Sequence, residues 1–144
     1  MVAKSPEVQD YFRNRWGEVT EKTYLARVEG RMEKESGVFE SLLVEDADMR
    51  VHSTTDKTRG RLARTEWKVV SDSPHPLVEV LLRTGRKNQI RVHFAEAGHP
   101  VVGDVKYGIA RGRATLCLHA WRLAFIHPHS GKRLVFETAL PKWA

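Results

Sequence analysis

The sequence predicts an α+β fold, with a mixed, largely antiparallel sheet and flanking helices, in one domain over residues 1–144. Segments rich in β-branched and aromatic residues dominate the chain, whereas only two short stretches show helical spacing. The 144 residues are 41% hydrophobic, which suffices for one core, and no linker, repeat or low-complexity tract divides them. We therefore expect one unit built mainly by antiparallel pairing.

The first predicted element is a short helix over residues 5–17. Ser5 is suited to the N-cap, Pro6 to the first helical position and Gly17 to the stop. The apolar residues at helical spacing are Val8, Tyr11, Phe12 and Trp16. Residues 2–5 before it resemble the tail of a strand whose earlier part is missing, so the fold is expected to be truncated at its N-terminus.

Strands follow where the pattern alternates or runs apolar with β-forming residues, at 22–28, 38–44, 63–70 and 77–83. Between the second and third of these strands, the polar stretch 45–61 predicts a mobile loop. A second helix is expected over 88–97, where it buries Ile90, Phe94 and Ala97 and ends before Gly98 and Pro100.

The rest of the chain predicts short strands at 116–120, 121–128 and 132–140. Residues 128–131, Pro-His-Ser-Gly, have the composition of a hairpin turn between the last two of them.

Composition excludes several classes of protein. No apolar run approaches the roughly 20 residues of a membrane helix, and the N-terminus has no apolar signal region. We therefore expect a soluble, cytoplasmic protein. The single cysteine, Cys117, excludes an intramolecular disulfide and a zinc site built on cysteine pairs.

Basic residues are concentrated in three windows that lack acidic residues: 57–64, 83–93 and 106–113. The net charge of +6 suits a polyanionic partner such as nucleic acid. If the windows converge in space, they form one phosphate-binding surface. The alternative is that they are solvated loop charges with no shared face.

The most informative segment runs from Thr84 to Asp104. A strand ends in a glycine turn at Gly85, two cations follow at Arg86 and Lys87, and a helix then begins with unpaired backbone N–H groups. This arrangement is suited to holding a phosphate. Arg91 lies off the apolar face of that helix and either reaches into a cleft or forms a surface ion pair.

Two other chemistries are less well supported. Cys117 and His119 share one face of a strand, but no third group activates them, so a packed free cysteine is favoured. Histidines 93, 99, 127 and 129 lack carboxylate or thiolate partners at ligand spacing, so we expect no metal site.

The segment resembles the third signature motif of the RluA-type pseudouridine synthases. The matching residues are Thr84, Gly85, Arg86, Gln89, Ile90, Arg91, His93, Gly98, Pro100, Gly103, Asp104 and Tyr107. Three further stretches match in order, at 22–30, 60–65 and 118–131, so the resemblance covers essentially the whole chain. It implies the pseudouridine synthase catalytic-domain fold and conversion of uridine to pseudouridine in ribosomal or transfer RNA, without cofactor or metal.

The resemblance also assigns roles to single residues. Tyr24 would pack on a flipped-out target base, and Arg91 would pair with the nucleophilic aspartate. Leu118 is expected to line the active site. The residues expected to bind RNA are Lys22, Arg61, Arg86, Lys87, Asn88, Gln89, His93 and Arg113.

One departure concerns the nucleophile. The family's catalytic aspartate belongs to a His-Arg-Leu-Asp motif, which is absent from this sequence, and none of the six aspartates present replaces it. Asp104 matches a Gly-Asp turn with a structural role. Arg91, without that partner, is expected to open to water or an anion beside a partly uncovered Tyr24.

Three hypotheses therefore stand: a fragment of the isomerase that is inactive alone, a non-catalytic RNA-binding module derived from it, and a folded remnant that binds nothing. An unpaired sheet edge, with exposed apolar surface where the missing strand would pair, makes a dimer through that edge plausible.

Overall fold

The computed structural model describes residues 20–144 as one seven-stranded sheet with a single helix among these residues on one of its faces. The strands are β1 (Thr20–Arg27), β2 (Ser36–Glu45), β3 (Val51–Thr54), β4 (Arg61–Ser71), β5 (Leu77–Leu82), β6 (Leu118–Ile126) and β7 (Arg133–Glu137). The helix is α2 (Gln89–Glu96). The helix predicted over residues 5–17 and the strand end at 2–5 lie outside the described residues.

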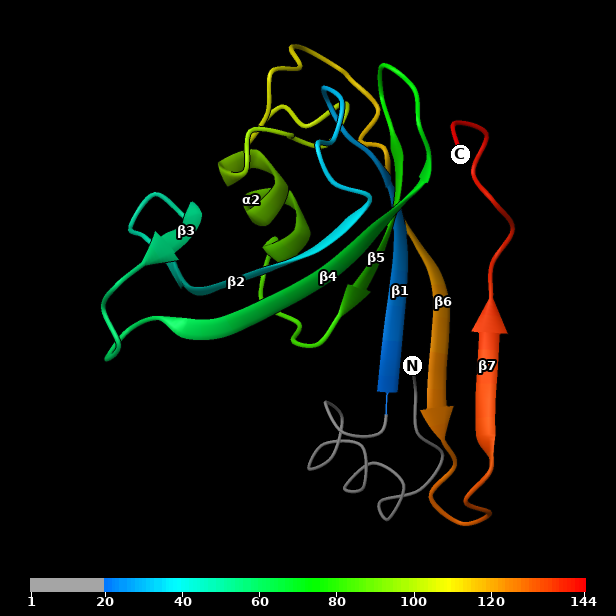
Figure 1. The fold of residues 1–144 in the computed structure, drawn as a ribbon. Helices are drawn as coiled ribbons and strands as arrows, with labels where there is room; N and C mark the ends of the chain where they lie inside the picture. The colour runs from blue at the N-terminus through cyan, green and yellow to red at the C-terminus, as the bar shows by residue number, and fades with distance from the viewer. Residues whose placement is uncertain (1–19) are drawn as a thin grey trace.

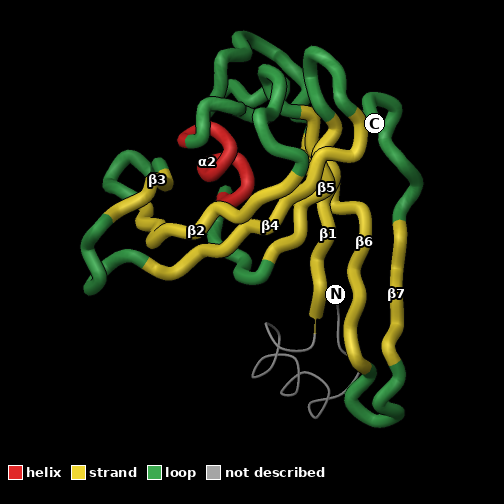
Figure 2. The backbone as a smooth tube through the Cα atoms, viewed as in Figure 1, coloured by secondary structure: helices red, strands yellow, loops and turns green. Residues whose placement is uncertain are grey.

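The strand order is β3-β2-β4-β5-β1-β6-β7, and every pair is antiparallel. This confirms the predicted α+β class. Figure 1 shows α2 lying over β2 and β4, with β6 and β7 next to β1 at the opposite edge of the sheet. Figure 2 shows that strands and loops make up most of this part of the chain and that α2 is its one helix.

The core forms where α2 packs on the middle of the sheet. Ile90 and Phe94 of α2 are buried against the alternate, inward-facing residues of the central strands. Those strand residues are Ala26, Trp67, Val78 and Val80. Burial of these side chains supplies the main force that holds α2 to the sheet.

Two predictions of secondary structure were wrong. The stretch 45–61, predicted as a mobile loop, contains β3, whose Val51 is buried in a second apolar cluster. A tight turn joins β2 to β3, because the Asp46 carboxylate accepts hydrogen bonds from the backbone N–H groups of Asp48 and Arg50. Met49 adopts a positive φ of 61° there, and no glycine marks the turn in the sequence.

The strands predicted at 116–120 and 121–128 form one strand, β6, which is irregular at Trp121. Thr23 pairs with Arg122 and Tyr24 pairs with Ala120, so Trp121 is the extra residue of a bulge. The predicted hairpin turn at 128–131 joins β6 to β7. Ala97, predicted to be buried, caps the C-terminus of α2 and is exposed, and Val92 of α2 is buried instead.

The loop after α2 depends on Gly103. Gly103 has a φ of +84°, and a Cβ there would overlap the carbonyl oxygen of Thr115. We expect Gly103→Ala to lower the free energy of unfolding by about 2–5 kcal/mol, from left-handed backbone strain and overpacking together. Urea denaturation followed by circular dichroism measures this loss of unfolding free energy.

Gly112→Ala is the matched control, because Gly112 has a φ of +68° with no atom within 4 Å of the added Cβ. It tests backbone strain alone, at about 1–2 kcal/mol. Equal losses in the two variants would contradict the close approach of the Gly103 and Thr115 segments.

Candidate functional site

The candidate site begins at the turn between β5 and α2. The side-chain amide of Gln89 holds this turn, because its Oε1 accepts hydrogen bonds from Thr84 Oγ1 at 2.8 Å and from the Arg86 backbone N–H at 3.0 Å. Its Nε2 donates to the Arg64 carbonyl oxygen at 3.0 Å and to Thr65 Oγ1 at 2.8 Å. All of its hydrogen-bonding capacity is used inside the protein.

Gln89 and His93, both expected to bind RNA, are therefore inside the fold rather than on its surface. They are 2% and 4% exposed. His93 Nδ1 lies 2.8 Å from Thr65 Oγ1, and its Nε2 lies 2.9 Å from Ser41 Oγ. Burial lowers the pKa of His93, which favours the neutral ring. The expectation of direct RNA contact is corrected for both residues: they position α2.

Arg91 is joined to Asp104 by two hydrogen bonds. Arg91 Nε and Nη2 donate to Asp104 Oδ2 and Oδ1, each at 2.9 Å. Asp104 Oδ1 also accepts from the backbone N–H groups of Lys106 and Tyr107. Burial opposes ionisation of Asp104, but the bonds from Arg91 and Tyr107 outweigh it and lower the pKa of the carboxyl.

This pair corrects the expectation that Arg91 opens to water or an anion. The Asp104 side chain is fully buried, whereas the Arg91 side chain keeps 22% exposure. The guanidinium also lies over the Tyr107 ring, 5.2 Å from its centroid. Its remaining nitrogen, Nη1, has a long contact of 3.5 Å with Asn88 Oδ1.

Tyr24 and Arg91 line the same cavity, which we call the central cavity. It has a volume of about 190 Å³, and its walls are Tyr24, Leu82, Arg86, Asn88, Gln89, Ile90, Arg91 and Leu118. The prediction that Tyr24 and Arg91 share a cleft is confirmed, since one comes from β1 and the other from α2. Leu118, expected to line the site, is also there.

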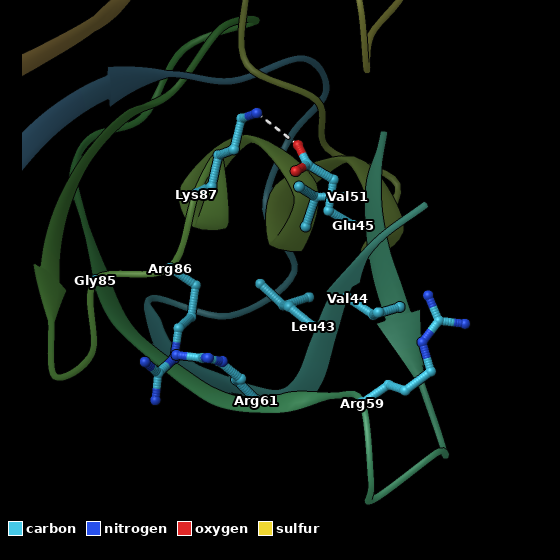
Figure 3. A pocket seen from close by; sticks show the side chains of 9 residues that line it. All are labelled: Leu43, Val44, Glu45, Val51, Arg59, Arg61, Gly85, Arg86 and Lys87. Atoms are coloured by element: carbon cyan, nitrogen blue, oxygen red, sulfur yellow. Dashed lines mark hydrogen bonds and ion pairs between the residues drawn. The ribbon is translucent and has the colours of Figure 1, made fainter. Parts of the chain in front are cut away.

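A second cavity, the basic cavity, adjoins the central one through Arg86. Its volume is about 540 Å³, and its lining is Leu43, Val44, Glu45, Val51, Arg59, Arg61, Gly85, Arg86 and Lys87. Figure 3 shows its cations coming from two segments: Arg59 and Arg61 from the loop before β4 and the first residue of that strand, and Arg86 and Lys87 from the turn before α2. The carboxylate among them, Glu45, pairs with Lys87 at 2.5 Å.

The first two basic windows thus converge, but not with all of their charges. Arg64 pairs with Glu40 and Glu66, and Arg83 pairs with the same Glu66. Arg113, expected to bind RNA, is exposed in the loop before β6 and lines neither cavity. Arg59 lines the basic cavity but was not predicted as a site residue, although the basic window 57–64 that contains it was identified.

Lys22 lies beside the glycine turn. A Cβ at Gly85 would be 3.2 Å from Lys22 Nζ, so the ammonium is close to the turn that carries Arg86 and Lys87. Burial lowers the pKa of Lys22. Lys22, which was predicted to bind RNA, therefore adds a cation between β1 and the two cavities.

Among residues 20–144, no group of three or more histidine, cysteine or acidic side chains is placed to hold a metal ion. No helix in that range is long and apolar enough to cross a membrane. Cys117 is buried, and burial raises the pKa of its thiol.

The Arg91–Asp104 pair predicts a specific loss of stability. We expect Asp104→Asn to lower the free energy of unfolding by about 2–3 kcal/mol, less than for a fully buried pair because Arg91 is partly exposed. Denaturation at pH 7 measures the loss, and Asp72→Asn is the control, because Asp72 pairs with Arg31 on the exposed surface.

The pKa of Asp104 is lower in the folded protein than its unfolded value of about 3.9. The stability that the ionised carboxyl contributes is therefore complete well above pH 4 and lost as the pH falls through the folded pKa. The difference between wild type and Asp104→Asn should shrink over that acidic range. A difference that stays constant down to pH 2 would contradict the ion pair.

Comparison with known proteins agrees with this geometry. The family model described as RNA pseudouridylate synthase matches residues 1–96. The chain is 35% identical over 153 residues to the ribosomal large subunit pseudouridine synthase D of Nitrosomonas europaea, covering 98% of this chain and 44% of that protein. It is 34% identical over 140 residues to the dual-specificity RNA pseudouridine synthase RluA of Yersinia pestis, covering 94% and 66%.

Among solved structures, human RNA pseudouridylate synthase domain containing 1 aligns with a TM-score of 0.75 at 23% identity. The alignment covers 93% of this chain and 59% of that structure, which shows the same fold. The chain spans 41–44% of the synthase D relatives and about two thirds of the Yersinia pestis relative. On the family match and these identities, the chain belongs to the RNA pseudouridylate synthase family.

Proposed function

We propose that this chain is the part of a pseudouridine synthase catalytic domain that binds an RNA strand and forms one side of the uridine site. The observation that carries the proposal is the meeting of Tyr24 and Arg91 in the central cavity, next to the basic cavity. An aromatic ring and a guanidinium beside a phosphate-binding surface are what a flipped-out base on a polyanion requires.

The basic cavity supplies the affinity in this proposal. Arg59, Arg61, Arg86 and Lys87 face one carboxylate, Glu45, so the cavity attracts phosphates. Leu43 and Val51 provide an apolar floor, each 4% exposed. The strand then passes Arg86, which lines both cavities, and places a uridine against Tyr24.

Arg91 has the geometry to organise the reacting end of the site. Asp104 fixes two of its nitrogens, and Nη1 remains with the long contact to Asn88. A second carboxylate meeting Nη1 would be held ionised next to the base, which is the state that a nucleophilic aspartate needs. Ribosomal or transfer RNA is the proposed substrate, which implies action in the cytoplasm.

The alternative is an RNA-binding module without catalysis, and one observation favours it for the isolated chain. Asp104 is the aspartate that contacts Arg91, but its side chain is fully buried and both oxygens accept hydrogen bonds. Asp46 and Asp56 bind backbone N–H groups in turns. None of these three carboxylates is available to attack a nucleoside.

RNA binding by the 144-residue chain should depend steeply on salt, because bound phosphates release counterions. Replacing Arg86 and Lys87 with alanine should weaken binding to every RNA sequence and reduce the salt slope by about one to two units. Fluorescence anisotropy with a labelled single-stranded RNA, titrated from low to physiological salt, measures both quantities.

The charge-matched control replaces Arg31 and Lys34, two cations that line a different surface hollow together with acidic residues. This double variant should retain the wild-type slope. A wild-type chain with no salt dependence, or equal effects of the two double variants, would rule out the basic cavity as the RNA surface.

The isolated chain should not convert uridine to pseudouridine, because no aspartate of residues 20–144 faces the central cavity as a nucleophile. A tritium-release assay on unmodified RNA labelled at uridine C5 tests this, with an active relative as positive control. Turnover above the protein-free background would show that a carboxylate of this chain acts as the nucleophile.

A further inference from the structure

A third cavity opens on the other side of Tyr24, and we call it the aromatic cavity. It has a volume of about 380 Å³ and is lined by residues of β1, β6 and the β7 region. The side chains that matter for its chemistry are Lys22, Tyr24, Leu123 and Phe136. Neither Leu123 nor Phe136 has a role in the proposed function.

The register of the sheet explains how this cavity forms. Lys22 pairs with Leu123, and Leu123 pairs with Phe136, so these three side chains lie on the face that also carries Tyr24. Tyr24 pairs with Ala120, which is too small to cover the ring.

The walls of this cavity offer flat apolar surfaces. Phe136 stacks on Phe125, with ring centroids 5.7 Å apart and an interplanar angle of 13°, yet Phe136 is 58% exposed. Part of that ring therefore remains open to solvent. An exposed aromatic ring held in place by a second ring is a surface on which a planar ligand can stack.

A cation lies on the same face as the Phe136 ring. Lys22 lines the cavity and lies beside Gly85 of the basic cavity. Arg122 instead pairs with Thr23 and Glu137, so its guanidinium, 4.4 Å from the centroid of the Trp121 ring, lies on the opposite face of the sheet. A flat apolar wall with a cation nearby matches a nucleobase joined to a phosphate better than it matches an aliphatic ligand.

The position of the aromatic cavity indicates which nucleobase of the RNA would bind there. Tyr24 lines both the central and the aromatic cavity, so the two adjoin across its side chain. An RNA strand with its uridine against Tyr24 brings a neighbouring nucleotide to the aromatic cavity. We propose that the aromatic cavity binds an unstacked nucleobase of the same RNA strand, adjacent to the target uridine, by stacking on Phe136.

This inference rests on the proposed function, so its test measures RNA binding in a way that separates the two. The probes are hexauridylate and a hexamer of the same sugar-phosphate backbone in which every nucleotide is abasic. Each is titrated by anisotropy against wild type and Phe136→Ala. The control is Val135→Ala, which removes an exposed apolar side chain from the same strand but outside the cavity.

We expect Phe136→Ala to weaken binding of hexauridylate about tenfold, as for the loss of one base–aromatic stack. It should leave binding of the abasic hexamer and the salt slope unchanged, because the phosphate contacts are intact. Phe136→Tyr, which keeps a ring, should restore most of the affinity. Val135→Ala should bind both probes as wild type does.

The opposing outcomes are distinct. Equal losses for the intact and abasic probes, or no loss with either, would overturn the stacking site while leaving RNA binding in place. A wild-type chain that binds neither probe would overturn the proposed function and this site with it. A wild-type dimer that Phe136→Ala converts to a monomer in sedimentation would assign the aromatic cavity to a second copy of the chain. Thermal melts of each variant exclude unfolding as the cause.

Discussion

The candidate site depends on one buried hydroxyl, that of Thr65 on β4. Gln89 Nε2 donates to Thr65 Oγ1, so the hydroxyl proton is available to His93 Nδ1. A ring that accepts at Nδ1 carries its proton on Nε2, which then donates to Ser41 Oγ. Two side chains of α2 are thus fixed to the sheet by directional bonds, and leaving any of these buried groups unpaired would cost about 1–3 kcal/mol. The turn that presents Arg86 and Lys87 follows from this attachment.

The sequence predicted the strands β1, β2, β4 and β5 and the helix α2 closely, because period-two alternation and helix-end signals are local properties. It missed β3, because the turn before it uses an aspartate and a methionine at positive φ instead of glycine. It also divided β6 at Trp121, where the alternation breaks because a bulge inserts one residue. Both errors arise from pairing partners that the local pattern does not contain.

The same limit explains which of the predicted site residues line the cavities and which do not. Arg86 and Arg91 were identified by the spaced motif over 84–107 and Tyr24 by the match at 22–30, and all three line the central cavity. Charge density alone did not separate the cations of the basic cavity from Arg64 and Arg83, whose charges are balanced across the sheet by Glu66. Gln89 and His93 are buried because both bond to Thr65, which lies more than 20 residues earlier in the chain. The local sequence around Gln89 and His93 does not contain this partner, so the two polar side chains were predicted to lie on the surface.

In the proposed uridine site, the Arg91–Asp104 pair determines where the guanidinium lies. A guanidinium remains charged at every physiological pH, and a partly buried one without a carboxylate would be costly. Asp104 meets that cost through Nε and Nη2, and it is itself held by the backbone of residues 106 and 107. Arg91 is therefore placed by the fold before any second acid approaches. In the proposed site, such preorganisation lets Nη1 pair with a nucleophilic carboxylate without the arginine side chain first having to be positioned.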